Sequence, residues 1–375
     1  MKQMHQLTLD DLKLNQPLQW DVYDANGKLL LCKGYLVTRD SQLDSIIARG
    51  MFVESTAFIK SSSQSAQSAQ PTQKFNPFWL WDDIQSKLTR CLRNMAKEEN
   101  VAFQIESIAS LVQFLSEKDA DVGISVMMMQ DTIKTPMPHT IHVAIVCELI
   151  GKRLGWELHK RISSVCAALT MNVSMLETHV RLLHQNTPLL PHQLEEIRSH
   201  PIRSYEMLQA AGITNEDWLN AVRDHHENKN GTGYPREIKD SSDIAELIHI
   251  ADVFCAKVAP RAHRKAIAPN QAARELFLEN GDQSTNQIPM LLIKEVGIYP
   301  PGAFVILVNK EIAIVLRRGE SANTPLVYSL TDPTGTPYAG GLKRDTSKKE
   351  FAIASVIPRE KITVRINLPR IWGYE

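Results

Sequence analysis

The sequence predicts a mainly helical protein in which a helical domain lies between a small α+β module and a β-rich module. Apolar residues recur every three or four positions from residue 76 to about residue 290, the period of an amphipathic helix. An Asn-Gly pair separates two apolar runs near the start of the chain, and short β-branched runs follow Ile298. These three patterns divide the chain into three parts.

Residues 1–60 are expected to form the α+β module. The runs LQWDVYD and KLLLCKGYLV flank Asn26-Gly27, and an Asn-Gly pair between apolar runs is a strong hairpin signal. A helix-like stretch, SQLDSIIARG, follows. Residues 61–74, SSSQSAQSAQPTQK, are nearly free of large apolar side chains, which is typical of a flexible linker. We therefore expect a domain boundary there.

Residues 75–118 are expected to form connecting helices, and residues 119–296 the main helical domain. The connecting part begins with the aromatic group FNPFWLW at 75–81. Such a group most often seals a helix against a core, and the alternative is an apolar patch through which the chain forms a homodimer. The runs FVILV, IAIVL, LVYSL, FAIASVI and KITVRI then predict a β-rich extension over residues 297–375.

Charge and cysteine content exclude several classes of protein. The chain has 42 basic and 42 acidic residues, so no overall field attracts DNA or an anionic membrane. The five cysteines are scattered without a CxxC pair, which is typical of buried thiols in a reducing compartment. The first residues lack an apolar signal core, and no stretch reaches the roughly 18 apolar residues of a membrane helix. We expect a cytoplasmic protein.

Histidines are concentrated in the helical domain. His139 and His142 are three residues apart, His200 precedes a proline, and His225 and His226 are adjacent and followed by a glutamate. Neutral imidazoles are good ligands for iron, manganese or zinc, so this pattern predicts a metal or phosphate site. The alternative for the other histidines is that they are ordinary surface or hydrogen-bonded side chains, namely His142, His159, His179, His184, His192 and His263.

The segment HHENKNGTGYP at 225–235 is the most specific motif in the sequence. Gly231 and Gly233 can adopt positive φ and bring backbone close to a ligand, and Pro235 fixes the exit of the loop. Here the sequence resembles the HD-GYP family, bacterial signalling proteins of the HD phosphohydrolase superfamily. Its members are cyclic di-GMP phosphodiesterases with a two- or three-metal site in a helical domain, and the resemblance extends from about residue 119 to 300.

The resemblance implies roles for residues that follow in the family's order. The positions that match metal ligands are His139, His200, His225, His226 and Asp252. The positions that match substrate-binding residues are Gly231, Gly233, Tyr234, Pro235, Arg261 and Arg264. Guanidinium groups suit the phosphates of a dinucleotide. For the two arginines, two solvated charges at a helix end are the equal alternative.

One part of the family's pattern is missing. Where the resemblance requires a histidine-aspartate pair and a lysine, the stretch CAALTMNVSML places Met171, Asn172 and Met175. A carboxylate in such a site bridges two cations and orients the attacking hydroxide, and neither a thioether nor a neutral amide carries that charge. We therefore expect a degenerate site with no certain catalytic residue, holding one divalent transition metal (iron, manganese or zinc) or none.

Two functions remain open at this point. The first is a degenerate HD-GYP protein in cyclic di-GMP signalling that works by binding, either to cyclic di-GMP or a related dinucleotide, or to a signalling protein such as a diguanylate cyclase. The second is an active metal-dependent phosphodiesterase whose surviving histidines hold the metal. The absent carboxylate favours the first.

Overall fold

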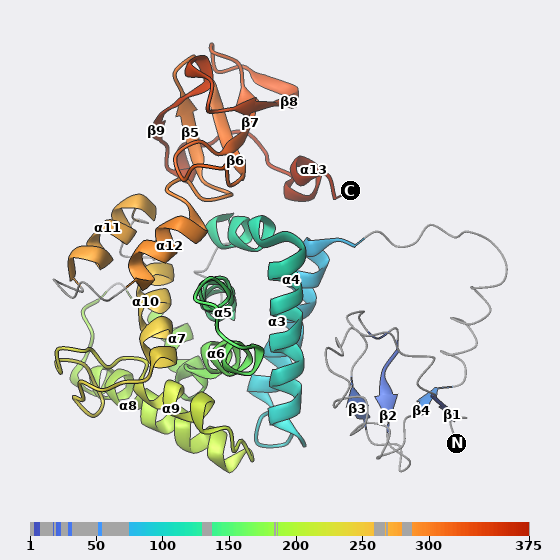
Figure 1. Cartoon of the computed structure of the whole chain (residues 1–375), viewed down its shortest axis with the longest axis vertical. Helices are drawn as coiled ribbons and strands as arrows, with labels where there is room; N and C mark the ends of the chain where they lie inside the picture. Colours follow the sequence, from blue (N-terminus) through green and yellow to red (C-terminus); the bar gives the residue numbers. More distant parts are fainter. Residues whose placement is uncertain are drawn as a thin grey trace.

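The computed structural model describes residues 4–7, 18, 20–23, 29–31, 52–54, 75–129, 137–183, 185, 187–258, 267, 269–279 and 287–374. The expected linker at 61–74, Asn26-Gly27, Arg261 and Arg264 lie outside these ranges. Within them, helices form the centre of the molecule and two antiparallel sheets lie toward the chain ends, which confirms the expected fold class (Figure 1).

The N-terminal sheet consists of four short strands. They are β1 (Met4–Gln6), β2 (Val22–Tyr23), β3 (Leu29–Leu31) and β4 (Phe52–Glu54). Their order is β1-β4-β2-β3. Strands β2 and β3 pair antiparallel, with Val22 opposite Leu31, so the two apolar runs that flank the Asn-Gly pair do lie side by side.

Helix α3 (Pro77–Arg93) carries most of the aromatic group that opens the helical part. Asn76 caps it by accepting a hydrogen bond from the backbone N–H of Phe78 at 2.9 Å, and the proline follows at the first helical position. Phe78 and Trp81 are buried in the core, which confirms the sealing role, whereas Trp79 is 57% exposed. Self-association through this group stays a prediction.

The helical body is organised around α5. Its helices are α4 (Val101–Met129), α5 (Met137–Arg153), α6 (Leu158–Thr170), α7 (Leu176–Leu183), α8 (Pro191–Ala210), α9 (Glu216–Asp224), α10 (Asp243–Val258), α11 (Pro269–Glu279) and α12 (Ile288–Val296), with a 3-10 turn η3 (Val173–Met175) between α6 and α7. Every residue from Met137 to Gly151 is buried. A helix that is buried on all sides belongs at the centre of a helical body, and α4, α6, α10 and α12 surround α5.

The C-terminal part is a five-stranded antiparallel sheet, which confirms the β-rich module. Its strands are β5 (Phe304–Leu307), β6 (Ile312–Arg317), β7 (Leu326–Thr331), β8 (Pro337–Asp345) and β9 (Ile353–Val356), in the order β8-β7-β6-β5-β9. Two 3-10 turns, η4 (Lys349–Phe351) and η5 (Arg359–Lys361), and a last helix, α13 (Leu368–Trp372), complete it.

A cluster of charged groups joins this module to α4. Helix α4 is interrupted at Asp119, which has φ −157° and ψ 78° and accepts the backbone N–H of Val122 at 3.1 Å. The buried Asp119 carboxylate also pairs with Arg317 at the end of β6 and accepts the hydroxyl of Tyr374 at 2.6 Å. One carboxylate therefore caps the second half of α4 and ties it to two C-terminal side chains.

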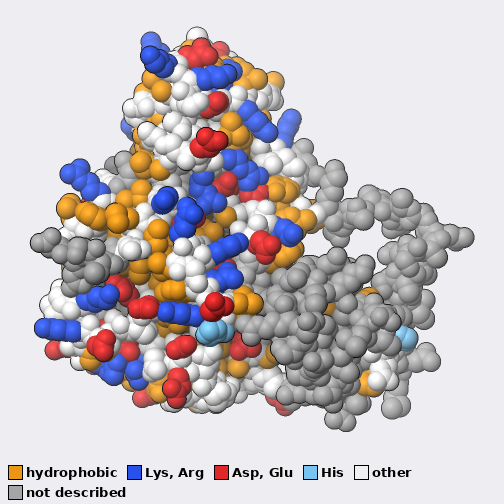
Figure 2. Space-filling model, in the orientation of Figure 1, with side chains coloured by type: hydrophobic (Ala, Val, Ile, Leu, Met, Phe, Trp, Pro, Cys, Tyr) orange, Lys and Arg blue, Asp and Glu red, His pale blue; other side chains and the backbone are white. Residues whose placement is uncertain are grey.

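The surface and the thiols agree with the composition. Basic and acidic side chains are interspersed on the face shown in Figure 2. Within the described ranges, no helix is both long enough and apolar enough to cross a membrane. Cys91, Cys147, Cys166 and Cys255 are buried free thiols.

Candidate functional site

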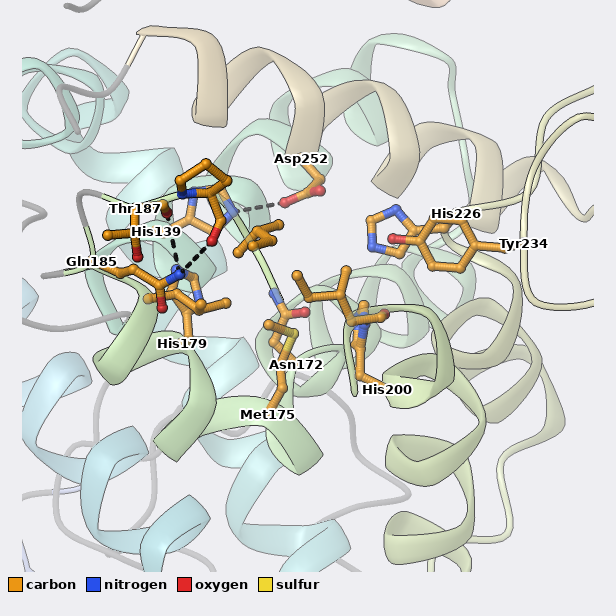
Figure 3. A pocket seen from close by; sticks show the side chains of 14 residues that line it. His139, Asn172, Met175, His179, Gln185, Thr187, His200, His226, Tyr234 and Asp252 are labelled. Atoms are coloured by element: carbon orange, nitrogen blue, oxygen red, sulfur yellow. Dashed lines mark hydrogen bonds and ion pairs between the residues drawn. The ribbon is translucent and has the colours of Figure 1, made fainter. Parts of the chain in front are cut away.

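A cavity of about 540 Å³ lies among α5, η3, α7, α8 and α10. It is lined by His139, Asn172, Met175, His179, Leu182, Gln185, Thr187, Pro188, Leu189, Ile197, His200, His226, Tyr234 and Asp252 (Figure 3). Its volume is within the usual range for small-molecule sites, which combine an apolar wall with a few converging polar groups.

Three histidines form a compact cluster at one end of this cavity. His200 lies on α8, whereas His225 and His226 directly follow α9, and one ring nitrogen of each lies within 4.8 Å of the others. Trp218 holds α9 in place, because its buried indole donates to Thr170 Oγ1 at 2.8 Å. The sequence therefore brings the three imidazoles together through the packing of two helices.

The local backbone fixes the tautomers of two of these rings. His200 Nδ1 lies 2.6 Å from the carbonyl oxygen of Ile197, and this oxygen is available because Pro201 has no N–H to donate to it. His225 Nδ1 lies 2.7 Å from the carbonyl oxygen of Val222, in the last turn of α9, where helix carbonyls lack helical partners. Because carbonyls only accept, each Nδ1 carries the proton and each Nε2 presents a lone pair.

The two lone pairs face each other. His200 Nε2 and His225 Nε2 lie 3.1 Å apart in a buried setting, an arrangement that repels unless a positive charge lies between or beside them. His226 completes the set, and its ring stacks on Tyr234 with centroids 4.6 Å apart. Three imidazole nitrogens with an open side are a usual ligand set for a catalytic or binding zinc-type cation, so the residues present fit a divalent transition metal.

Electrostatics keep the cluster in its ligand form. Burial, together with the charge of His200, lowers the pKa of His225 to about 3. Burial also lowers the pKa of His200, and burial with the charge of His225 lowers the pKa of His226 well below its usual value. All three rings are therefore neutral at pH 7, which is the form that binds a metal.

His139 and Asp252 form a separate pair across the cavity. His139 Nε2 lies 2.6 Å from Asp252 Oδ1, and both side chains are largely buried. Burial alone would raise the pKa of Asp252, but the hydrogen bond and charge of His139 hold it well below the usual value, with His226 and His225 contributing. The carboxylate is therefore ionised and already engaged by His139.

The GTGYP loop is held by its own backbone. A Cβ on Gly233 would lie 2.5 Å from three backbone atoms of residues 226–228, so only glycine fits there, and Gly231 has φ +79°. Tyr234 N–H donates to the carbonyl of His226 at 3.1 Å. Because Gly233 has no side chain, it can pack against the backbone of residues 226–228. This close packing places Tyr234 against His226.

Met171, Asn172 and Met175, which replace the expected histidine-aspartate pair and lysine, do not all lie in the same place. Met171, at the end of α6, is fully buried in the hydrophobic core, whereas Asn172 and Met175 line the cavity. In the view of Figure 3, Asn172 lies between the His139–Asp252 pair and His200. A neutral amide therefore lines the cavity where the resemblance requires a carboxylate.

Most of the expected site residues meet at this cavity. The expected ones among its lining residues are His139, Asn172, Met175, His200, His226, Tyr234 and Asp252, and His225 Nε2 lies 3.1 Å from His200 Nε2. Gly231, Gly233 and Pro235 are not among the lining residues, and Arg261 and Arg264 are outside the described ranges.

Sequence reasoning missed His179, which had been placed among ordinary histidines. Its ring lies 6.3 Å from that of His139, centroid to centroid. A signal was present, because positions 172, 175, 179 and 182 follow the i, i+3, i+7, i+10 spacing of one helical face, and all four line the cavity.

Comparison with known proteins identifies the domain that contains this cavity. Residues 105–284 match the model of the HD domain family. The chain is 24% identical over 192 residues to cyclic di-GMP phosphodiesterase PdeB of Borreliella burgdorferi, covering 51% of this chain and 50% of that protein. It is 28% identical over 164 residues to cyclic di-GMP phosphodiesterase PA4108 of Pseudomonas aeruginosa, covering 43% and 39%. The matches thus span half or less of these relatives.

A solved structure shares the fold over a longer stretch. The HDG"Y"P protein Bd1817 of Bdellovibrio bacteriovorus superposes with a TM-score of 0.50 at 18% identity, covering 78% of this chain and 99% of that one. At this identity the likeness concerns the fold alone.

Proposed function

Because residues 105–284 are an HD domain related to the cyclic di-GMP phosphodiesterases, we propose that this protein binds a guanine dinucleotide of this class without hydrolysing it. A single divalent transition metal, held by His200, His225 and His226, anchors the phosphate. This function is a signalling role: the protein responds to the nucleotide by binding it.

The observation that carries the proposal is that the histidines of the site fall into two groups. His200, His225 and His226 offer ring nitrogens to a metal, whereas His139 is already hydrogen-bonded to Asp252. The nitrogen lone pairs of His200 and His225 face each other at 3.1 Å, whereas the carboxylate of Asp252 is engaged by His139 at 2.6 Å. The two facing lone pairs need a cation, whereas the His139–Asp252 pair needs no further partner. We therefore expect one bound cation in the cavity.

The same division argues against hydrolysis. Among the described lining residues, Asp252 supplies the single carboxylate, and Asn172 stands where a bridging carboxylate is required. A two-metal site needs such a group to hold both cations 3.5–4 Å apart and to stabilise both the attacking and the leaving oxygen. A neutral amide cannot offset the charge of a second cation.

The rest of the cavity suits a nucleotide. Leu182, Pro188, Leu189 and Ile197 give the cavity an apolar part of its lining. Such a lining can cover a base or ribose while the polar end holds the phosphate. We assign Tyr234 to the ligand contacts because it lines the cavity beside His226. Gly231, Gly233 and Pro235 would act by shaping its loop, and Arg261 and Arg264 by holding phosphates.

One observation favours active phosphodiesterase as the second candidate. Three protein ligands with an open position are also the arrangement of catalytic single-metal sites, in which the cation supplies a nucleophile at neutral pH and polarises the phosphoryl group. This reading needs a side chain in the cavity to orient the attacking water. Asn172 and His179 are the described candidates.

Calorimetric titration of cyclic di-GMP into the metal-loaded protein tests the proposal, with the recovered nucleotide analysed by chromatography. Saturable binding that a chelator and His225→Ala both abolish, with the nucleotide recovered intact, is the expected result. Binding that persists in the chelator, or no binding at all, would overturn it. Leu190→Ala is a matched control, because Leu190 is 52% exposed and lies outside the lining.

A further inference from the structure

We propose that Arg236 is a positioning residue for the metal site, because it holds the histidine pair at 225–226 and the loop that carries Tyr234 in one fixed arrangement. The inference rests on the proposed function, since the cation it concerns is the one held by the three histidines. Arg236 is not among the residues that line the cavity. It acts through the two carboxylates that flank the histidine pair in the sequence.

The guanidinium of Arg236 binds the carboxylate that precedes the pair. Arg236 Nε donates to Asp224 Oδ1 at 3.1 Å, and Nη2 donates to Oδ2 at 2.9 Å. Asp224 is buried and is the last residue of α9, so His225 directly follows it. A two-pronged bond between a guanidinium and a carboxylate fixes the orientation of both groups. The loop is thereby tied to the end of the helix from which the first histidine of the pair extends.

The backbone of Arg236 binds the carboxylate that follows the pair. Glu227 comes directly after His226, is buried, and accepts the N–H of Arg236 at Oε1 over 2.6 Å. Its Oε2 accepts the N–H of Ile238 at 3.1 Å. Each oxygen of this carboxylate therefore holds one N–H of the segment that follows Pro235.

These contacts close a ring around the histidine pair. The N–H of Glu227 donates to the carbonyl of Asp224 at 2.9 Å, and the side chains of both residues bind Arg236. Tyr234 donates its own N–H to the carbonyl of His226 at 3.1 Å. A displaced loop must therefore move His226 or break one of these bonds. Groups that orient metal-binding histidines from outside typically change metal affinity by about 10–100-fold.

A second arginine on the same carboxylate provides a matched control. Arg223 Nε and Nη2 donate to Asp224 Oδ1 and Oδ2 at 3.0 and 3.1 Å. Arg223 belongs to α9 and is adjacent to Asp224 in sequence, so this bond ties α9 to itself and not to the loop. Loss of either arginine leaves Asp224 a partner in the other. The two changes therefore remove the same charge and the same kind of bond, and they differ in whether the loop is released.

Titration of cobalt(II) into the full-length, metal-free protein tests the inference, because the visible absorption of the bound ion reports both affinity and coordination geometry. Arg236→Ala is expected to bind cobalt(II) at least about tenfold more weakly than the parent, with an altered spectrum, whereas Arg223→Ala should match the parent. Arg236→Lys keeps the charge and the aliphatic stem without the planar fork, so its affinity should lie between those of the parent and Arg236→Ala. Urea unfolding of the metal-free proteins is measured in parallel, since a purely structural role lowers stability and leaves the spectrum of the bound ion unchanged.

Parent-like affinity and spectrum in Arg236→Ala, or equal losses in Arg236→Ala and Arg223→Ala, would overturn the inference. The proposed function stands in either case if the parent binds cobalt(II) and cyclic di-GMP. If Arg236→Ala does not fold, Arg236→Lys decides, and parent-like binding in that variant overturns the inference. A folded parent that binds no cobalt(II) would instead overturn the single-cation site of the proposed function, on which the inference rests.

Discussion

His200 and His225 present their Nε2 atoms to each other at 3.1 Å, while His200 donates its Nδ1 proton to a carbonyl of α8 and His225 donates its Nδ1 proton to a carbonyl in the last turn of α9. The arrangement depends on Pro201, which releases the Ile197 carbonyl, and on the end of α9, which releases that of Val222. Two acceptors held at this distance define the place of a cation.

The first prediction concerns metal content. His225→Ala removes one of the facing ligands, so bound cation should fall from about one per chain to near zero, because two imidazoles hold such ions weakly. His139→Ala should keep the cation, because His139 is engaged with Asp252. Elemental analysis of both purified variants measures this. Loss of the cation in His139→Ala would show that the two halves of the cavity act as one site.

The second prediction concerns the loop. Gly233→Ala places a methyl group 2.5 Å from the backbone of residues 226–228, so the loop must move. We expect a loss of about 1–3 kcal/mol in the free energy of unfolding, as for other overpacked sites, together with weaker metal binding. Gly340→Ala is the control, since nothing lies within 4 Å of its added carbon. Urea unfolding that is equal for both variants would contradict the tight fit.

A third prediction follows from His142, which is buried beside Trp81 with ring centroids 5.0 Å apart. Its Nε2 has no hydrogen-bond partner among the described residues, and burial, with the charge of His139, lowers its pKa well below 6.5. Below pH 6.5 the unfolded chain therefore binds a proton that the native protein does not, so stability falls as the pH falls.

His142→Phe removes this contribution and keeps the ring stacked. Between pH 7 and pH 5 the free energy of unfolding should fall by about 2 kcal/mol less in the variant than in the parent. This figure follows because pH 5 lies about 1.5 units below the pKa of an unfolded histidine, and each unit is worth about 1.4 kcal/mol. Urea unfolding of the chelator-treated proteins at both pH values measures the difference. An equal loss in both would show that His142 takes up its proton in the native state.

The fourth prediction tests the link between α4 and the C-terminal module. Asp119→Ala leaves Arg317 with Asp121 at 3.8 Å and removes the acceptor for Tyr374 and the cap of Val122. Arg317 is 35% exposed and keeps Asp121, so the main losses are the helix cap and the hydrogen bond to Tyr374, and we expect about 1–3 kcal/mol less stability in thermal or urea unfolding. Lys87→Ala breaks a surface pair with Asp83 and should change stability by less than about 1 kcal/mol. Similar effects of the two changes would argue against the link.

The helical and β-rich parts and the histidine cluster could be predicted because both depend on local sequence patterns. Helical period and β-branched runs identify elements without knowledge of their partners. His200-Pro201 and His225-His226 likewise carry their geometry locally, since the proline and the helix end provide the carbonyls that orient two of the rings.

Other features depend on contacts between distant segments. The bond between His139 and Asp252 joins residues 113 positions apart, and it decides which histidines remain available to a cation. An added Cβ on Gly233 would lie 2.5 Å from backbone atoms of its own loop, a constraint that the motif alone does not show. Met171 and Asn172 are adjacent in sequence, yet one enters the core and the other the cavity wall. Such outcomes follow from packing, which local patterns do not encode.

A single-turnover experiment tests the central claim most directly. Metal-loaded protein in excess over cyclic di-GMP is incubated for hours, quenched, and the nucleotide is separated by chromatography. We predict complete recovery of intact cyclic di-GMP, because one cation on three neutral histidines, with Asn172 beside it, lacks the second cation and bridging carboxylate. Appearance of linear di-GMP or GMP that His225→Ala abolishes would contradict the account and establish a single-metal phosphodiesterase.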